Sequence, residues 1–159
     1  MLVALVLALA PCLLPPLDAP VTDPFRMPAC TYCPGNRGIE YAPRDGTSVV
    51  AVADGDVDFA GSVAGTTWVV VRHADGLRAS YGHLATRRVG RGDHVRAGQV
   101  LGTTTDRFYL GLLDGDRPVD PTPLLGRLRR PPRLVPTDGT PARPARPPQL
   151  VCPNTRPGR

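Results

Sequence analysis

The chain has 159 residues, which allows one small domain with flanking segments. Its net charge of +5 is unevenly distributed: residues 127–159 contain eight Arg and one acid, whereas residues 1–126 contain 11 Arg and 13 acids. Because the larger part of the chain is slightly acidic, the composition argues against a nucleic-acid-binding protein, which would carry a basic face on its folded domain.

The N-terminal segment, residues 2–14, is apolar and uncharged. About 13 residues are too few for a membrane span, which needs roughly 20, but they suit the apolar region of a secretion signal. No Lys or Arg precedes the segment, so a retained membrane anchor and lipid attachment at Cys12 remain alternatives. We expect residues 1–19 to be a signal-like segment cleaved near Ala19, and the protein to be exported to the cell envelope or beyond.

The chain contains four cysteines. Cys12 would leave with the signal, and Cys152 stands alone in the C-terminal tail. Cys30 and Cys33 form a C-x-x-C pair, for which a disulfide is the simplest state in an exported protein. A redox-active pair and a metal-binding pair are alternatives. The Pro-Gly after Cys33 disfavours the helix that a redox pair needs, and a metal would need two further ligands.

The central zone, residues 20–126, contains short segments rich in β-branched residues or with period-two alternation. The expected strands cover residues 48–53, 56–61, 66–73, 77–84, 99–104 and 108–113. Four Asp-Gly pairs, which tolerate the positive φ of a hairpin turn, punctuate this zone: Asp45-Gly46, Asp54-Gly55, Asp75-Gly76 and Asp114-Gly115. The pattern predicts an all-β antiparallel sandwich or barrel, with no helix.

The tail, residues 127–159, contains nine Pro and few apolar side chains. Because Pro removes backbone donors and few apolar groups are available to offset the ordering entropy, we expect a disordered or polyproline-like segment. Its positive charge would suit anionic wall polymers or lipid headgroups, through an attraction that salt screens.

Four segments of the central zone occur in an order that resembles the lysostaphin-like zinc metalloendopeptidases. They are GTSVVAVADGDVDFAG, WVVVRHADGLRASYGHL, VGRGDHVRAGQVLG and the last strand before DGDRPVDP. The resemblance covers about residues 33–126, and the opening CPGNRG is similar to the C-P-G-H-R-G of short secreted actinobacterial members. It implies the duplicated β hybrid motif of that family and a relation to enzymes that cut peptidoglycan cross-bridges.

Family members bind zinc through the His and Asp of H-x-x-x-D and the second His of H-x-H, while the first His of H-x-H and the His of Y-x-H-L assist catalysis. Three protein ligands leave a fourth position on zinc for an activated water. The corresponding residues here are Asn36, Glu40 and Gly111 at the ligand positions, and Tyr109 and His83 at the catalytic ones. Only His83 keeps the family residue, so the resemblance implies a degenerate metal site.

We therefore expect no cofactor and a domain that binds peptidoglycan or a partner hydrolase without cleaving it, with Tyr81, His83 and Tyr109 lining the groove. The alternative is an atypical zinc peptidase that uses Glu40, His83 and a further ligand.

The remaining histidines, His73 and His94, lie near turns and are expected to be solvated. The segment VGRGDHVRAGQVLG also resembles the turn of biotinyl and lipoyl carrier domains, but the chain has no Lys to carry such a group.

Overall fold

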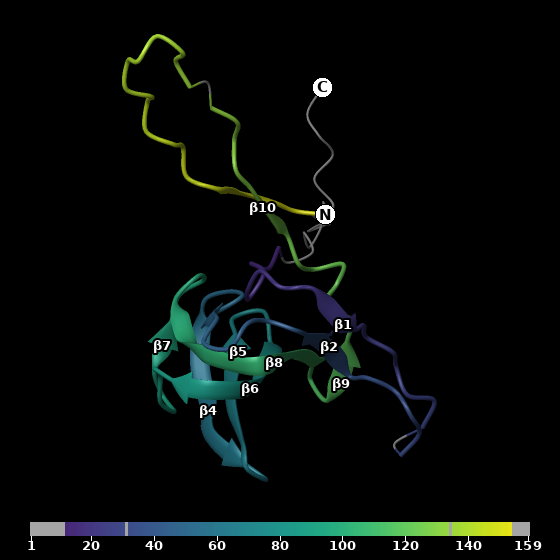
Figure 1. Cartoon of the computed structure of the whole chain (residues 1–159). Coiled ribbons are helices and arrows are strands. Elements are labelled where there is room, and N and C mark those ends of the chain that lie inside the picture. The colour runs from purple at the N-terminus through teal and green to yellow at the C-terminus, as the bar shows by residue number, and fades with distance from the viewer. Residues whose placement is uncertain (1–11, 31, 134, 154–159) are drawn as a thin grey trace, which may run out of the picture.

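The computed structural model describes residues 12–30, 32–133 and 135–153. Within these ranges a nine-stranded antiparallel sheet has the order β1-β2-β8-β6-β5-β4-β7, and β3 and β9 pair with β8 outside this path (Figure 1). A separate two-stranded sheet joins β10 to β11. This architecture confirms the predicted all-β antiparallel fold. No helix in the described ranges is long and apolar enough to cross a membrane.

The strands are β1 (Val21–Asp23), β2 (Gly38–Tyr41), β3 (Ser48–Val50), β4 (Gly55–Val63), β5 (Thr66–His73), β6 (Leu77–Arg87), β7 (His94–Val95), β8 (Val100–Asp114), β9 (Arg117–Val119), β10 (Arg127–Arg129) and β11 (Gln149–Val151).

Strand β8 is central to the sheet. It is a single strand of 15 residues where the sequence predicts two, residues 99–104 and 108–113. It pairs with β2, β3, β6 and β9, so most of the sheet depends on it. Phe108, Leu110 and Leu112 point into the core and are fully buried. Because side chains alternate along a strand, Tyr109 and Gly111 point to the opposite face.

In three of the four predicted Asp-Gly turns the glycine has a positive φ, 77° at Gly46, 89° at Gly76 and 59° at Gly115, but the aspartate does not, so the predicted conformation is confirmed for the glycine only. Gly55 differs, because it begins β4 instead of closing a turn. A Cβ at Gly55 would lie 2.4 Å from the carbonyl oxygen of Arg72, so this glycine is needed for close strand approach. The hairpin between β4 and β5 turns at Ala64-Gly65, where φ is 50° and 80°.

Tyr81 belongs to the core. It is fully buried, and its hydroxyl accepts a hydrogen bond of 2.9 Å from the backbone N–H of Val52. Its ring packs near Phe108, with centroids 6.5 Å apart. Burial raises the pKa of the Tyr81 phenol, so the hydroxyl stays protonated. The prediction that Tyr81 lines a binding groove is therefore wrong, because β6 turns this side chain toward the interior.

His73 is also buried, contrary to the prediction that it is solvated. Its Nδ1 lies 2.7 Å from the carbonyl oxygen of Asp54, so this nitrogen carries the proton and donates it. The residue packs at the end of β5 beside β4, where strand pairing excludes water. His94 is exposed, as expected, and its Nδ1 lies 2.9 Å from a carboxylate oxygen of Asp56.

The segment before β1 packs against the domain. Leu13 is only 2% exposed, and its N–H donates to the carbonyl oxygen of Leu124. The N–H of Leu14 donates to Val52, and the carbonyl oxygen of Pro16 accepts from Val50. Residues from Leu13 onward therefore contribute to the core, which differs from a signal-like segment reaching residue 19. The rest of the predicted signal, residues 1–11, lies outside the described residues.

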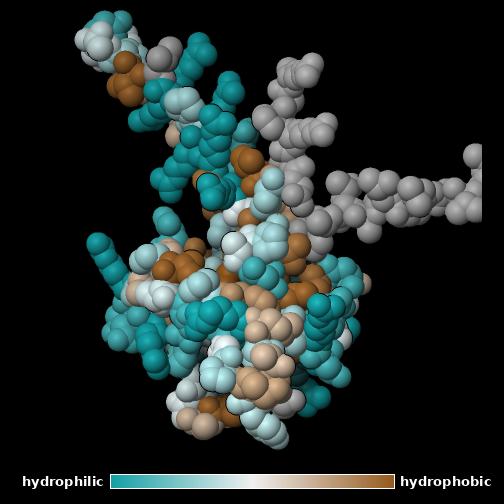
Figure 2. All heavy atoms as spheres, turned by 90° about the vertical axis from the view of Figure 1, so that its right-hand side faces the viewer, coloured by the Kyte–Doolittle hydropathy of each residue, from teal (hydrophilic) through white to brown (hydrophobic). Residues whose placement is uncertain are grey.

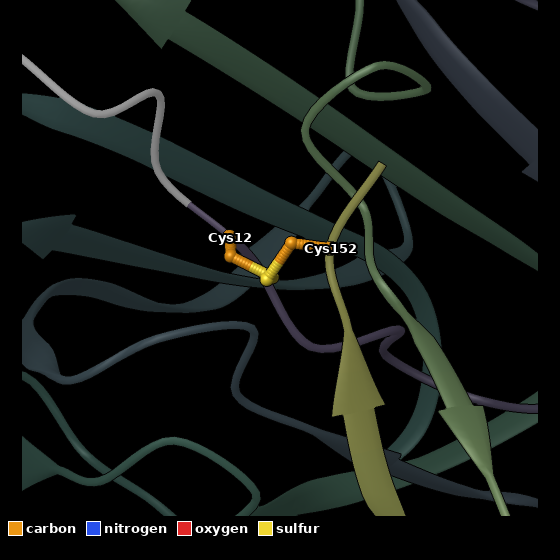
Figure 3. Close-up of a disulfide and its surroundings, with 2 residues drawn as sticks. All are labelled: Cys12 and Cys152. Atoms are coloured by element: carbon orange, nitrogen blue, oxygen red, sulfur yellow. A yellow bond between two sulfur atoms is a disulfide. The ribbon is translucent and has the colours of Figure 1, made fainter. Parts of the chain in front are cut away.

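Cys12 and Cys152 form a disulfide that joins the two ends of the described chain (Figure 3). The expectation that Cys152 stands alone is wrong, because it is bonded to Cys12. The loss of Cys12 with a cleaved signal stays a prediction. Beside this bond β10 and β11 pair in register, with Leu128 opposite Leu150. Residues 127–129 and 149–151 are thus ordered where a disordered segment is predicted, because they pair with each other across the sequence. Cys30 and Cys33 form the second disulfide.

Replacing Cys12 and Cys152 together by Ser is expected to lower the free energy of unfolding by roughly 3–5 kcal/mol, because the bond spans 140 residues and constrains the unfolded chain. Urea unfolding followed by circular dichroism measures this. The matched control replaces Cys30 and Cys33, which close a loop of sequence separation 3 and should matter less. Equal losses for the two pairs would contradict the prediction.

Replacing Tyr81 by Phe removes the acceptor for the Val52 N–H and leaves that donor buried without a partner. We expect a loss of about 1–3 kcal/mol in the free energy of unfolding, measured by the same urea titration. An unchanged unfolding midpoint would show that the Val52 N–H finds another acceptor.

Candidate functional site

The candidate site lies on the face of the sheet opposite the core side chains of β8. Tyr109 of β8 pairs with Glu40 of β2 on one side and with Gly82 of β6 on the other. Because cross-strand partners point to the same face, Glu40 and Tyr109 lie side by side on this surface. His83 follows Gly82 on β6, and Trp68 comes from the neighbouring β5.

Three rings form a cluster on this face. The ring of Trp68 meets that of Tyr109 edge-on, with centroids 5.6 Å apart and an interplanar angle of 68°. The imidazole of His83 also lies near Trp68, with 6.2 Å between the ring centroids. All three side chains are half-buried. The cluster therefore offers partly exposed aromatic edges next to an imidazole and a carboxylate.

Glycines on adjacent strands make room for these rings. A Cβ at Gly38 would lie 2.5 Å from Cζ of Tyr109, and one at Gly111 would lie 2.9 Å from Cε1 of the same ring. A Cβ at Gly82 would lie 2.5 Å from Cζ3 of Trp68. These distances are too short for a real side chain, so the two aromatic rings lie directly on glycine backbone. Gly111, where the family resemblance expects a zinc ligand, is here part of the floor under Tyr109.

His83 has an unusual backbone conformation. Its φ is 60°, in the left-handed region that non-glycine residues rarely adopt. The pairing of β6 with β8 shifts register between Gly82 and Leu84, so His83 sits in a bulge. A bulge re-aims the side chain it contains, and strained residues of this kind occur preferentially at functional sites. Here the bulge places the imidazole beside Trp68.

The electrostatics of the site keep Tyr109 neutral. Burial raises the pKa of the Tyr109 phenol, and the negative charge of Glu40 raises it further, while Arg37 acts weakly in the opposite direction. At neutral pH the phenol therefore retains its proton and is able to donate a hydrogen bond. A protonated phenol beside a carboxylate provides one donor and one acceptor on the same surface.

Asn36 serves the fold. It is only 7% exposed. Its Nδ2 donates to the carbonyl oxygen of Asp23, and its Oδ1 accepts from the N–H of Gly38, both at 3.2 Å. Its backbone N–H and C=O also pair with those of Arg26. Both polar ends of the side chain are thus engaged with backbone at the start of β2.

A zinc ion of the kind that the family resemblance implies does not fit these residues. Asn36 is engaged with backbone, Gly111 has no side chain, and Glu40 alone remains of the three ligand positions. Among the described residues no group of three or more His, Cys, Asp or Glu side chains is placed to hold a metal. The arrangement suits contact with a ligand through rings and hydrogen bonds.

The model of Peptidase family M23 matches residues 34–110, which contain β2, β5 and β6 and the part of β8 that ends at Leu110. This part of the chain is an M23 peptidase-fold domain. The match agrees with the resemblance seen in the sequence.

Curated relatives of the M23 domain include proteins with different descriptions. The cell division protein DipM of Caulobacter vibrioides is 32% identical over 58% of this chain and 18% of its own length. The DD-carboxypeptidase/endopeptidase Mpg of Neisseria meningitidis is 42% identical over 41% and 15%. The murein hydrolase activator NlpD of Escherichia coli is 30% identical over 55% and 25%. The chain therefore spans a quarter or less of these relatives.

Solved structures share the fold. Helicobacter pylori Csd3 superposes with a TM-score of 0.66 at 24% identity, covering 73% of this chain and 33% of that one. The catalytic domain of lysostaphin from Staphylococcus simulans gives 0.57 at 22% identity, covering 66% and 90%. A catalytic-domain mutant of the M23 protein EnpA from Enterococcus faecalis gives 0.55 at 29% identity, covering 64% and 88%.

Of the residues that the sequence singles out, the structure places Glu40 beside Tyr109, and His83 and Tyr109 both next to Trp68. Tyr81 is buried in the core, and the side chain of Asn36 is engaged with backbone. Sequence reasoning missed Trp68, whose ring contacts both His83 and Tyr109. A partial signal was available, because Trp68 is the only Trp in the chain and lies in an expected strand. Which residues lie next to Trp68 depends on the order of the strands in the sheet and on the bulge at His83.

Replacing Gly111 by Ala should displace the Tyr109 ring, because the added Cβ would lie 2.9 Å from Cε1. We expect a loss of roughly 1–3 kcal/mol in the free energy of unfolding and a changed Trp68 emission spectrum. Gly90→Ala is the matched control, since its Cβ would meet only Asp93 Oδ2 at an ordinary 3.8 Å. Unchanged emission and stability in Gly111→Ala would show that the ring adapts without cost.

Proposed function

We propose that the M23 domain of this chain is an exported, non-catalytic module that binds peptidoglycan peptides through the face formed by Trp68, His83, Tyr109 and Glu40. One observation carries the proposal: the Tyr109 ring covers Gly38 and Gly111, so aromatic surface occupies the place where the family resemblance expects zinc ligands. Hydrolysis through a metal-activated water needs three protein ligands that leave a position open, and the described residues do not supply them.

The chemistry of this face suits a peptide that carries an ammonium group. Trp68 presents a half-exposed indole, which attracts cations through its ring electrons. The Glu40 carboxylate lies on the same face, where a cationic ligand group could donate charge-assisted hydrogen bonds to it. The protonated Tyr109 hydroxyl adds a donor for a peptide carbonyl. Cell-wall stem peptides contain both of these chemical groups.

The descriptions of the relatives support a second candidate, a partner hydrolase that binds the same domain. NlpD is described as a murein hydrolase activator and DipM as a cell division protein, so M23 relatives of this chain include proteins described by roles other than peptidase. A domain that binds such a hydrolase would use an exposed face whose polarity is comparable to that of the Trp68, His83, Tyr109 and Glu40 face.

The two disulfides favour an oxidising compartment, because such bonds are rare in the reducing cytosol. Together with the relative described as a murein hydrolase activator, they support export to the cell envelope.

Binding is tested with purified peptidoglycan sacculi in a co-sedimentation assay, and with soluble muropeptides by Trp68 fluorescence. Tyr109→Ala is expected to reduce affinity roughly tenfold or more, because an aromatic contact at the centre of a site contributes on the order of 1–3 kcal/mol. Tyr32→Ala is the matched control, since Tyr32 is 98% exposed in the Cys30–Cys33 loop, outside the site. No binding by the wild type would reject peptidoglycan as the ligand and favour the hydrolase.

The absence of catalysis is tested by adding excess zinc to the full chain, desalting, and measuring zinc by elemental analysis and peptidoglycan cleavage by chromatography. We expect near-zero zinc and no new products, and Glu40→Ala should behave as the wild type. One zinc per chain, with cleavage that Glu40→Ala abolishes, would instead establish the zinc peptidase that uses Glu40 and His83.

A further inference from the structure

We propose that residues 127–152, here called the basic loop, form a second binding site for a linear, phosphate-rich polymer of the cell envelope. This site is separate from the aromatic face of the M23 domain and lies beyond residues 34–110. The proposal rests on how the loop is anchored, on its unneutralised charge, and on its composition.

The basic loop is held at both of its ends. Its first residues form β10 and its last form β11, which pair as an antiparallel ladder. Cys152 immediately follows β11 and is bonded to Cys12, whose neighbour Leu13 is buried in the domain. Figure 1 shows the intervening chain projecting away from the sheet as an open loop. The strand pairing and the disulfide therefore hold both ends of the basic loop next to the domain.

The loop carries positive charge that the described protein does not neutralise. Its six arginines are all exposed: Arg127, Arg129, Arg130, Arg133, Arg143 and Arg146. None of them forms an ion pair with an acid among the described residues. The only acid in the loop, Asp138, accepts hydrogen bonds from the backbone and hydroxyl of Thr140 within its own turn. Figure 2 shows hydrophilic residues along most of this projection.

The two arms of the loop approach each other. Nη1 of Arg133 on the outgoing arm donates to the carbonyl oxygen of Arg143 on the returning arm, at 3.2 Å. Seven prolines fix φ along the arms and hold them extended. Arginines from both arms are thus presented along one narrow projection. Because the loop is closed and rich in proline, it loses less conformational entropy on binding than a free tail of the same sequence.

The composition of the loop favours a phosphate polymer over a membrane or a nucleic acid. The guanidinium group matches phosphate oxygens in a bidentate geometry, and a row of such groups matches a chain with repeating charges. The loop has no aromatic residue on which bases would stack. Among the described residues of the loop, the exposed large apolar side chains are Leu128 and Val151 at the base and Val135 on the outgoing arm, whereas membrane-surface segments present a continuous apolar face.

The test measures binding of the full oxidised chain to fluorescently labelled long-chain inorganic polyphosphate by anisotropy, over a range of NaCl concentrations. One variant changes all six loop arginines to Gln. The matched control changes six exposed arginines of the domain to Gln: Arg44, Arg87, Arg88, Arg91, Arg96 and Arg117. Circular dichroism melts confirm that both variants fold. Parallel titrations use vesicles of phosphatidylglycerol and a single-stranded DNA of matched charge.

We expect the wild type to bind polyphosphate with an affinity that falls steeply with salt, and the loop variant to lose roughly tenfold or more with a flatter salt dependence. The domain control and Tyr109→Ala should stay within about twofold of wild type, which separates this site from the peptidoglycan face. Equal affinity of the loop variant and the domain control would overturn the proposal. Tighter binding to the vesicles or to the DNA than to polyphosphate would overturn it as well.

Discussion

The alternation of side chains along β8 is the constraint on which the rest of the structure depends. Phe108, Leu110 and Leu112 fill the core from one face, and Tyr109 and Gly111 build the candidate site on the other. A shift of one residue in this strand would exchange the two faces, so the hydrophobic core fixes the register of the site. The core thus determines which positions of β8 face outward, and the contacts of the outer face determine which residue occupies each of them.

On that outer face, glycine and aromatic residues have complementary roles. Gly38, Gly82 and Gly111 remove side chains from β2, β6 and β8, and the rings of Tyr109 and Trp68 cover the exposed backbone. A ring on bare backbone is held by contact along its whole face, which gives a rigid surface without metal ligands. The bulge at His83 adds an imidazole to the edge of this surface. The site is thus a coherent packing arrangement built around rings.

The ends of the chain add a second level of organisation. Leu13 enters the core, Cys12 holds Cys152, and β10 pairs with β11, so segments from both ends close over the domain. The domain and the basic loop differ in charge, since the acids are concentrated in the former and the arginines dominate the latter. The aromatic face of the domain and the basic loop therefore differ in chemistry, and the Cys12–Cys152 disulfide links the loop to the domain. This arrangement is compatible with simultaneous contact with a peptide and a polyanion.

The sequence by itself indicated β3 to β6, both parts of β8, the glycines of most turns and the family resemblance, because alternation, Asp-Gly pairs and segment order are local signals. It did not indicate the short strands β1, β2, β7, β9, β10 and β11. It also identified Glu40, His83 and Tyr109, since aligned motifs preserve position. Only the tertiary structure decided that Tyr81 faces the core, that Asn36 is used by backbone, that Trp68 joins the site and that Cys12 meets Cys152. These four outcomes depend on strand order, a bulge and contacts across the whole chain. Such long-range contacts leave no periodic trace in the sequence.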